Sequence, residues 1–377
     1  MFLLGSVKEY DDTTDRLERP NGLGEGRDKA IHEMRLPRKV VVGEGVIEKL
    51  PEVDDRLLET RKILIVTGKN ILERLGDKLE AGWDKGQEIK IAFSCEATMS
   101  EVERLAAIST KEGAEVILGV GGGRTIDLAK MTAYKLNKDF ISIPTAASHD
   151  GISSQFVSIK GGGRAYSYET KPPNSIIVDI DVIASAPPRL TASGVGDAIS
   201  KVIAVRDWRL AHEKSGEYFG FYAAQLALMG ADLVMKSALG IGRGEKESVR
   251  TLVEALISDG VAAGIAGSSR PCSGSEHLFS HALDFNSSQH ALHGEQCGVG
   301  TIMMAHLHGL RYEDMRNTLR ETGAPTNVDE LGVSGENIVK ALVLAPKIRP
   351  DRYTILNMEK LDESKAKNLA RDTGVIP

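Results

Sequence analysis

In the first half of the chain, short apolar runs alternate with segments of helical spacing. Residues 70–82 and 100–113 place apolar side chains three and four positions apart, the spacing of an amphipathic helix. Strands that alternate with helices predict a parallel α/β sheet over residues 36–190. Five apolar runs are the predicted strands of this sheet: 61–67, 88–93, 114–120, 138–143 and 175–178.

The pattern changes after Pro187 and Pro188, where the strand-like runs end. We therefore predict an α/β domain over residues 33–190 and an all-helical domain over residues 191–377, and a chain of 377 residues suits two domains. Residues 1–32 are polar and charged, so we expect an N-terminal extension with little packed structure. Helical periodicity or strong helix formers cover five later segments: 191–210, 217–239, 246–266, 275–285 and 299–308.

Composition narrows the class of protein. With 41% hydrophobic and 27% charged residues, the chain is typical of a globular protein rather than a disordered one. The net charge is −6 and there is no dense run of Lys and Arg, so neither nucleic acid nor an anionic membrane surface is an expected partner. No stretch reaches the roughly 18 to 20 apolar residues of a membrane helix. Since Phe2, Leu3 and Leu4 are too few for a signal-peptide core, we expect a cytoplasmic protein.

The three cysteines, Cys95, Cys272 and Cys297, are scattered and form no CxxC pair. This argues for a reducing compartment and against a disulfide framework or a cysteine-bound structural zinc. Free cysteine packs well as a small side chain. We therefore expect Cys272 and Cys297 to be small buried fillers.

A glycine-rich turn follows the third predicted strand, in the segment AEVILGVGGGRTID (114–127). Glycines at a strand-to-helix turn let backbone N–H groups approach phosphate oxygens, and a helix N-terminus favours negative charge. The segment differs from the usual dinucleotide fingerprint because Arg124 stands at the position of the third glycine. A second loop, PTAASHDG (144–151), follows the next strand. Both loops should emerge at the carboxyl edge of the sheet, where ligands bind.

Four of the nine histidines lie within 27 residues: His277, His281, His290 and His293. His277 and His281 are four residues apart and share one face of a helix. Neutral imidazoles bind zinc or iron, and a carboxylate often completes the set, as Asp197 in GVGDA could do. No HExxH motif occurs. The histidines alone leave both a metal site and a set of satisfied polar side chains open.

Five motifs follow one another in order over residues 33–345: GGGRTID, PTAASHDG, GVGDAISK, SEHLFSHALD and HGEQCGVG. Together they resemble the iron-containing alcohol dehydrogenase and glycerol dehydrogenase superfamily, and within it the sn-glycerol-1-phosphate dehydrogenase family. The resemblance implies a dehydroquinate synthase-like fold, with an α/β nucleotide-binding domain and an all-α metal-binding domain. It also implies homo-oligomers.

The resemblance implies a reaction as well: reversible reduction of dihydroxyacetone phosphate to sn-glycerol 1-phosphate, which supplies the backbone of archaeal ether phospholipids. A divalent metal, usually Zn²⁺, would be held by Asp197, His277 and His293. Asp150, Asp197 and His281 would act as catalytic and substrate-binding residues, and His290 would be structural. NAD(H) or NADP(H) would lie along Gly121, Gly122, Gly123, Arg124, Thr125, Ile126, Asp127, Thr145, Ala146, Ala147, Ser148 and Ser154.

Several points stay open at this stage. No acid follows the first predicted strand, where Lys69 stands, so we expect both NADH and NADPH to work. The proton for the new alcohol could come from Asp150, His281 or water. Candidates for the substrate phosphate are Lys160, Arg164, Lys171 and Arg270.

Three alternatives compete with the glycerol-1-phosphate interpretation. A glycerol dehydrogenase would use the same metal and hydride chemistry on an unphosphorylated substrate. A 3-dehydroquinate synthase-like lyase would have Glu as the first metal ligand, where this chain has Asp197, and a lysine-rich substrate site that we do not recognise. A non-catalytic metal- or nucleotide-binding sensor would have no reason to keep two cofactor loops and three metal ligands together.

Overall fold

The computed structural model describes residues 32–81, 83, 86–161, 164–287 and 291–377. Residues 34–377 form one compact unit, to which the following description applies. The predicted N-terminal extension, residues 1–32, lies outside the described residues except for His32, and so does His290.

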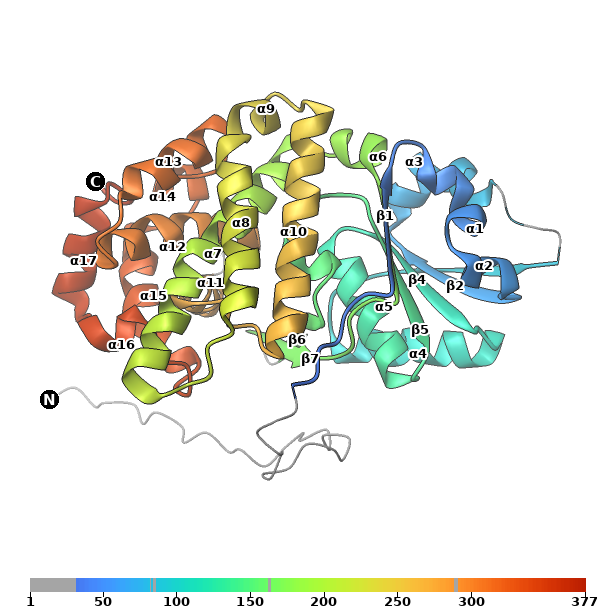
Figure 1. The fold of residues 1–377 in the computed structure, drawn as a ribbon, viewed down its shortest axis with the longest axis horizontal. Helices are drawn as coiled ribbons and strands as arrows, with labels where there is room; N and C mark the ends of the chain where they lie inside the picture. Colours follow the sequence, from blue (N-terminus) through green and yellow to red (C-terminus); the bar gives the residue numbers. More distant parts are fainter. Residues whose placement is uncertain (1–31, 82, 84–85, 162–163, 288–290) are drawn as a thin grey trace, which may run out of the picture. The chain divides into compact units, whose positions relative to one another are not determined.

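Six parallel strands form the main sheet, in the order β1-β8-β5-β4-β2-β3 (Figure 1). Successive side chains of the central strand β2 pack on opposite faces: Leu64 joins the core on one face and Ile63 and Ile65 join the core on the other. Burial on both faces explains why the predicted strands are continuous apolar runs. The strands are β1 (Lys39–Gly43), β2 (Lys62–Thr67), β3 (Glu88–Phe93), β4 (Val116–Gly121), β5 (Asp139–Pro144) and β8 (Ser175–Asp179).

The connections between strands reverse direction at one point of the sheet. Helix α3 (Lys69–Glu80) leads from β2 outward to β3, and α4 (Met99–Glu112) leads back to β4. Helix α5 (Gly123–Lys135) then leads from β4 in the opposite direction to β5. The order therefore reverses between β2 and β4, and ligands of open parallel sheets bind at such a point. Short helices η1 (Val46–Lys49), α1 (Leu50–Val53) and α2 (Asp55–Glu59) join β1 to β2.

The strands of this half that were not predicted are the edge strand β1 and an antiparallel hairpin of β6 (Phe156–Gly161) and β7 (Arg164–Glu169). In β6, Val157 and Ile159 are buried while Ser158 and Lys160 are exposed, so the strand alternates instead of forming an apolar run. The hairpin follows the turn η2 (Asp150–Ile152), which contains the end of the PTAASHDG loop.

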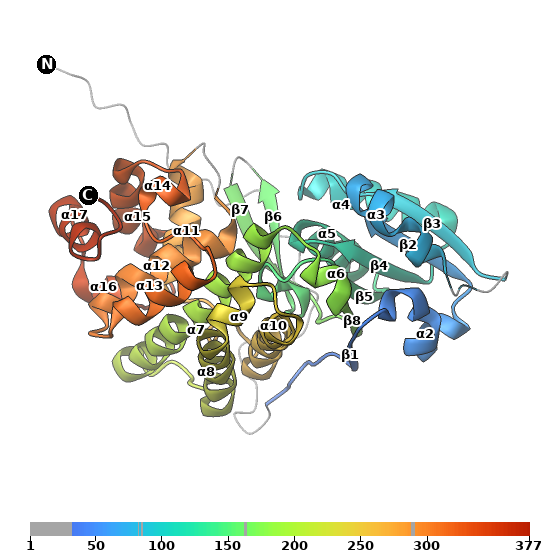
Figure 2. The same cartoon turned by 90° about the horizontal axis from the view of Figure 1, so that it is seen from above.

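The rest of the unit is helical (Figures 1 and 2). The predicted segment 246–266 is helix α10, whereas the segment predicted at 299–308 begins earlier, at His293. One hydrophobic core runs from Ile176 and Val178 of β8 into these helices. The predicted fold class is thus confirmed. The helices are α6 (Ile180–Ala184), α7 (Pro188–Ser215), α8 (Phe221–Lys236), α9 (Ala238–Gly242), α10 (Lys246–Ala266), α11 (Ser275–Asn286), α12 (His293–Leu307), α13 (Tyr312–Glu321), α14 (Val328–Leu331), α15 (Gly335–Ile348), α16 (Ile355–Glu359) and α17 (Glu363–Asp372).

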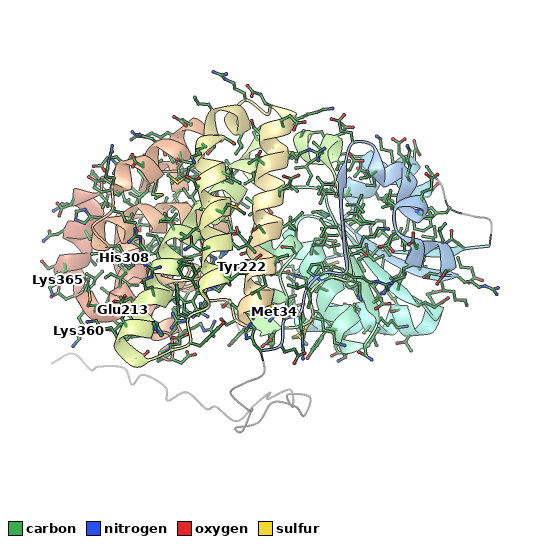
Figure 3. The ribbon with its side chains drawn as sticks, in the orientation of Figure 1. Met34, Glu213, Tyr222, His308, Lys360 and Lys365 are labelled. Atoms are coloured by element: carbon green, nitrogen blue, oxygen red, sulfur yellow. The ribbon has the colours of Figure 1, made fainter. Side chains whose placement is uncertain are left out.

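Asp207, buried on α7, fixes the start of helix α11. Its Oδ2 accepts a hydrogen bond from Ser275 N at 2.7 Å. Its Oδ1 accepts from Ile355 N at 2.7 Å and lies 3.0 Å from Nε2 of His308, a residue that is labelled in Figure 3. Because α11 carries the predicted metal ligand His277, these hydrogen bonds of Asp207 help to fix the position of that ligand.

Within the described residues, no helix is both long and apolar enough to span a membrane.

Candidate active site

Four potential metal-binding side chains meet where three helices of the unit come together. Asp197 lies on α7, His277 on α11, and His293 and Cys297 on α12. One ligand atom from each lies within 4.8 Å of all the others. Asp197 is completely buried and His277 is 7% exposed. The three residues that the sequence analysis grouped as ligands are therefore close together in space, and Cys297 joins them.

Glycines allow the backbones around Asp197 to approach closely. A Cβ at Gly196 would lie 2.1 Å from the carbonyl oxygen of Gly294, and one at Gly194 would lie 1.9 Å from that of Ala147. Only glycine fits such contacts without moving a backbone. Helix α7 is thus held against both α12 and the loop that follows β5. This packing places Asp197 beside His293 on one side and beside the PTAASHDG loop on the other.

Neighbouring groups fix the orientation of His277. Its Nδ1 lies 2.7 Å from Oε1 of the buried Glu276, and that same oxygen accepts from Gly274 N at 2.8 Å. Because a carboxylate accepts the Nδ1 proton, the other ring nitrogen, Nε2, is left as the ligand atom, and it lies 3.5 Å from Asp197 Oδ1. A carboxylate behind a ligating histidine is the usual arrangement at zinc sites.

A second chain of hydrogen bonds orients His293. Its Nδ1 lies 3.2 Å from Ser280 Oγ, which donates to Gln296 Oε1 at 2.6 Å. Gln296 Nε2 in turn donates to Asp284 Oδ1 at 2.8 Å. Because the hydroxyl proton of Ser280 is used on Gln296, the Ser280 oxygen accepts from Nδ1, and Nε2 of His293 is left free to bind a metal.

Lys201 supplies positive charge to the site, and the sequence analysis did not identify it. Its buried Nζ lies 2.8 Å from Asp197 Oδ1 and 3.0 Å from Asp150 Oδ2. Asp150 N also donates to Asp197 Oδ2 at 2.7 Å, which joins the loop to α7. Burial alone would lower the pKa of Lys201, but Asp150 and Asp197 hold that pKa well above its usual value. Burial alone would raise the pKa of Asp197, but Lys201 and His277 hold it well below its usual value.

A second buried acid, Asp259, lies within reach of Lys201. Burial raises the pKa of Asp259 well above its usual value, despite the charge of Lys201. Neither carboxylate oxygen of Asp259 has a hydrogen-bond partner within the described part of the chain. The predicted buried positions of Cys272 and Cys297 are confirmed. Cys272 Sγ contacts the Asp259 carbonyl at 3.0 Å, and Cys297 Sγ lies 3.6 Å from His293 Nε2.

His281 lies beside this cluster, with its ring stacked on His293 at a centroid distance of 6.0 Å. Burial, together with the charges of His277, Arg349 and Arg352, lowers the pKa of His281 to about 4. The ring is therefore neutral at pH 7. One buried carboxylate, two oriented imidazoles and a carboxylate behind one of them form a donor set that suits a divalent metal with positions open to substrate.

The two predicted cofactor loops lie side by side at the carboxyl edge of the sheet. Gly121 ends β4, Gly122 precedes α5, and Thr145 N donates to the Gly121 carbonyl at 3.0 Å. A Cβ at Gly123 would lie 1.7 Å from His149 Nε2, so the turn and the second loop are in contact. The remaining predicted cofactor residues follow these positions. They are Arg124, Thr125, Ile126 and Asp127 in the first turns of α5, Ala146, Ala147 and Ser148 after β5, and Ser154 after η2.

Several of these residues make contacts inside the protein, and one is Thr125, whose Oγ1 lies 2.9 Å from Ser94 Oγ. Asp127 is buried, and its Oδ2 accepts from Ser158 N of β6 at 3.0 Å. The Ser154 carbonyl accepts from the buried Nζ of Lys130 at 2.8 Å. Lys69, the first residue of α3, holds its Nζ 5.8 Å from the centre of the Phe93 ring. Asp127 therefore binds the backbone of the β6–β7 hairpin, and Lys130 binds the backbone of the segment that leads into it.

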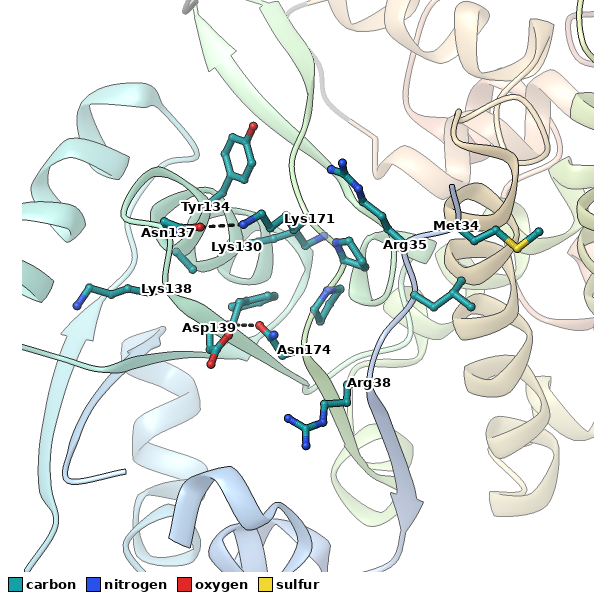
Figure 4. Close-up of a pocket in the computed structure, with 15 residues that line it drawn as sticks. Met34, Arg35, Arg38, Lys130, Tyr134, Asn137, Lys138, Asp139, Lys171 and Asn174 are labelled. Atoms are coloured by element: carbon teal, nitrogen blue, oxygen red, sulfur yellow. Dashed lines mark hydrogen bonds between the residues drawn. The ribbon is translucent and has the colours of Figure 1, made fainter. Parts of the chain in front are cut away.

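Two of the four candidates for the substrate phosphate, Arg270 and Lys171, make contacts elsewhere in the structure. Arg270 forms a double contact with Glu217 and donates to the Tyr353 carbonyl. Lys171 donates to Asn137 Oδ1 at 2.8 Å and lines a cavity of about 400 Å³ at the amino-terminal ends of β1, β5 and β8, the edge opposite the cofactor loops (Figure 4). Lys160 is exposed on β6, and the Arg164 side chain lies outside the described part of the structure.

Comparison with known proteins identifies the family. The family model described as iron-containing alcohol dehydrogenase matches residues 41–187. Glycerol-1-phosphate dehydrogenase (NAD(P)+) of Metallosphaera sedula is 48% identical over 348 residues, 92% of this chain and 99% of the relative. The enzyme of the same name from Thermococcus kodakarensis is also 48% identical, covering 93% of this chain and 100% of the relative.

Solved structures share the fold at low sequence identity. Glycerol dehydrogenase from Schizosaccharomyces pombe has a TM-score of 0.72 at 21% identity, covering 92% of this chain and 94% of that one. Sulfoacetaldehyde reductase from Bifidobacterium kashiwanohense, in complex with NAD+, has a TM-score of 0.70 at 16% identity, covering 92% and 100%. At this level of identity the likeness supports the fold alone.

Proposed function

Because the chain belongs to the glycerol-1-phosphate dehydrogenase family, we propose that it catalyses the reversible, NAD(P)-dependent reduction of dihydroxyacetone phosphate to sn-glycerol 1-phosphate. The observation that carries this proposal is the cluster of Asp197, His277 and His293 beside the loop that contains Asp150. From the family resemblance we also propose that the enzyme is a homo-oligomer and that its product supplies the backbone of archaeal ether phospholipids.

In this proposal Asp197, His277 and His293 hold one divalent metal, Zn²⁺ by resemblance to the family. Such a metal supplies Lewis acidity, which stabilises negative charge on a substrate oxygen. The residues of the chain prepare the site for it. Glu276 keeps the Nδ1 proton of His277 away from the cluster, and Lys201 balances the buried charge of Asp197.

Asp150 and His281 are the proposed substrate-binding and catalytic side chains, together with Asp197. The Asp150 side chain is 19% exposed and is held by Lys201, so it reaches the edge of the site without being free to turn. His281 is neutral at pH 7 and so keeps one ring nitrogen as a donor and one as an acceptor toward a hydroxyl group. The proton that the new alcohol oxygen needs comes from water, and either residue can relay it through a hydrogen bond.

NAD(P)H, which supplies the hydride, is proposed to bind along the glycine-rich turn and the second loop. Gly122 has no side chain to cap the first N–H groups of α5, so those groups are available to the cofactor's phosphates. We further propose that residues 33–190 bind the cofactor and residues 191–377 bind the metal and substrate. The site then lies where α7 meets the loop after β5.

The test is to follow NADH and NADPH oxidation with dihydroxyacetone phosphate and, in parallel, with dihydroxyacetone, both with added Zn²⁺. We expect net oxidation of cofactor and a strong preference for the phosphorylated ketone, with sn-glycerol 1-phosphate as the product in a chiral assay. Preference for dihydroxyacetone would replace the proposal with a glycerol dehydrogenase. Cofactor that is only transiently oxidised would point to a dehydroquinate synthase-like lyase.

A further inference from the structure

Arginine side chains gather around the start of helix α11, next to the proposed active site. Arg352 is 5% exposed and donates to the Ser273 carbonyl at 2.5 Å and to Ser269 Oγ at 2.8 Å. Both acceptors are neutral, and no carboxylate lies within 4.0 Å of this guanidinium among the described residues. A buried cation without a paired anion costs free energy. Arg352 therefore brings positive charge to the start of α11, while its hydrogen bonds hold the segment 269–273 in place.

Arg349 lies three residues earlier, directly after helix α15. Its side chain is 40% exposed, and its guanidinium lies 3.9 Å from the carboxylate of Asp351, which is itself 76% exposed. An exposed pair at this distance contributes little. Arg349 thus combines a weakly paired charge with a side chain that solvent can reach.

The position of these arginines relative to the active site follows from helix packing. Helix α15 packs along α11, and the two lie side by side in both views (Figures 1 and 2). The Arg352 bond to Ser273 brings the end of α15 to the start of α11. Arg352 therefore lies at the end of α11 that carries the proposed metal ligand His277, and Arg349 lies three residues before it in the chain.

The proposed substrate carries a phosphate group, so its site needs a group that binds an anion close to the metal-binding cluster. In dihydroxyacetone phosphate, three bonds separate the phosphorus from the carbonyl carbon, so the phosphate must lie close to the groups that bind the carbonyl. A phosphate dianion is best held by a guanidinium, which donates two parallel hydrogen bonds. Of the earlier candidates, Arg270 is already neutralised by Glu217, and Lys171 lies at the opposite edge of the sheet.

We propose that Arg349 binds the phosphate group of the three-carbon substrate. Arg352 is a positioning residue, because its hydrogen bonds connect the end of α15 to the segment 269–273. This assignment rests on the proposed function. The assignment makes Arg349 the side chain by which the enzyme distinguishes the phosphorylated ketone from the unphosphorylated one. The ligand class is a small phosphate monoester, and inorganic phosphate should compete for the same position.

The test replaces Arg349 by Gln and compares kcat/KM for dihydroxyacetone phosphate with kcat/KM for dihydroxyacetone. Hydrogen bonds to charged groups contribute enough that the ratio of the two values should fall by about 10- to 150-fold. The inhibition constant of inorganic phosphate should rise by a similar factor. Arg349→Lys, which keeps the charge but loses the fork of donors, should fall between Gln and wild type. Arg311→Gln is the matched control, since Arg311 also forms an exposed pair, with Asp314 at 3.4 Å, and the ratio should not change.

The outcomes separate this assignment from the proposed function. A wild-type enzyme that prefers dihydroxyacetone phosphate, with the same preference in Arg349→Gln, overturns the assignment and leaves the function intact. An equal loss on both ketones in Arg349→Gln also overturns it, because a structural defect would act on both. A wild-type enzyme with no preference for the phosphorylated ketone overturns both.

Discussion

Glu276→Gln tests whether the carboxylate behind His277 tunes a metal site. Glu276 is completely buried, its Oε1 serves both Gly274 N and His277 Nδ1, and its Oε2 has no hydrogen-bond partner among the described residues. Glutamine has nearly the same shape and keeps one carbonyl acceptor, so the change removes the negative charge and little else. A neutral partner makes the imidazole a weaker ligand.

The expected magnitude follows from the role of such carboxylates. Loss of a partner behind a ligating histidine typically weakens metal binding by about 10- to 100-fold, or about 1.4 to 2.7 kcal/mol. The apparent Kd for Zn²⁺, measured on the folded protein by competition with a chelator, should rise by that factor. The kcat at saturating metal should change much less than the Kd.

The control is Glu101→Gln on α4. Glu101 is also a buried glutamate, with Oε1 accepting from Cys95 N at 2.9 Å, but its ion-pair partner is Arg104 in the α/β half. This variant should lose stability without losing affinity for the metal. A Kd in Glu276→Gln within twofold of wild type, or an equal rise in both variants, would refute the reasoning.

Two further predictions concern the packing and charge around Asp197. Lys201→Met leaves Asp197 and Asp150 without their buried cation, so urea unfolding without metal should show a loss of about 3–5 kcal/mol, and a loss under about 1 kcal/mol would contradict the ion-pair account. Gly196→Ala puts a Cβ 2.1 Å from the Gly294 carbonyl, so it should cost about 1–3 kcal/mol and weaken metal binding. Gly76→Ala on α3, where the nearest atom is 3.7 Å away, should instead stabilise by about 0.5–1 kcal/mol, and similar effects at both glycines would contradict the argument from close approach.

The sequence predicts the sheet where burial produces a simple pattern. Strands such as β2 and β4 are buried on both faces, so their apolar runs are visible without any structure. Strand β1 has only three consecutive apolar residues, Val40 to Val42, and is partly exposed at the sheet edge. Strand β6 alternates buried and exposed side chains, so it has no apolar run. The predicted start of helix α12 lies six residues too late, at residue 299 instead of His293. The missed segment contains two glycines and several polar residues, which are weak helix formers or belong to the candidate site.

The candidate site could likewise be predicted only in part from the sequence. Lys201 and Cys297 each stand four residues after a predicted ligand, Asp197 and His293, so helical spacing offered a local signal for both. Asp259 offered none: it lies far along the chain, and only the packing of α10 against η2 and α7 brings it within reach of Lys201. Residue types and spacing therefore indicate which groups can bind a metal. The balance of buried charge around them depends on how closely the backbones approach, and that follows from glycine contacts between helices distant in the sequence.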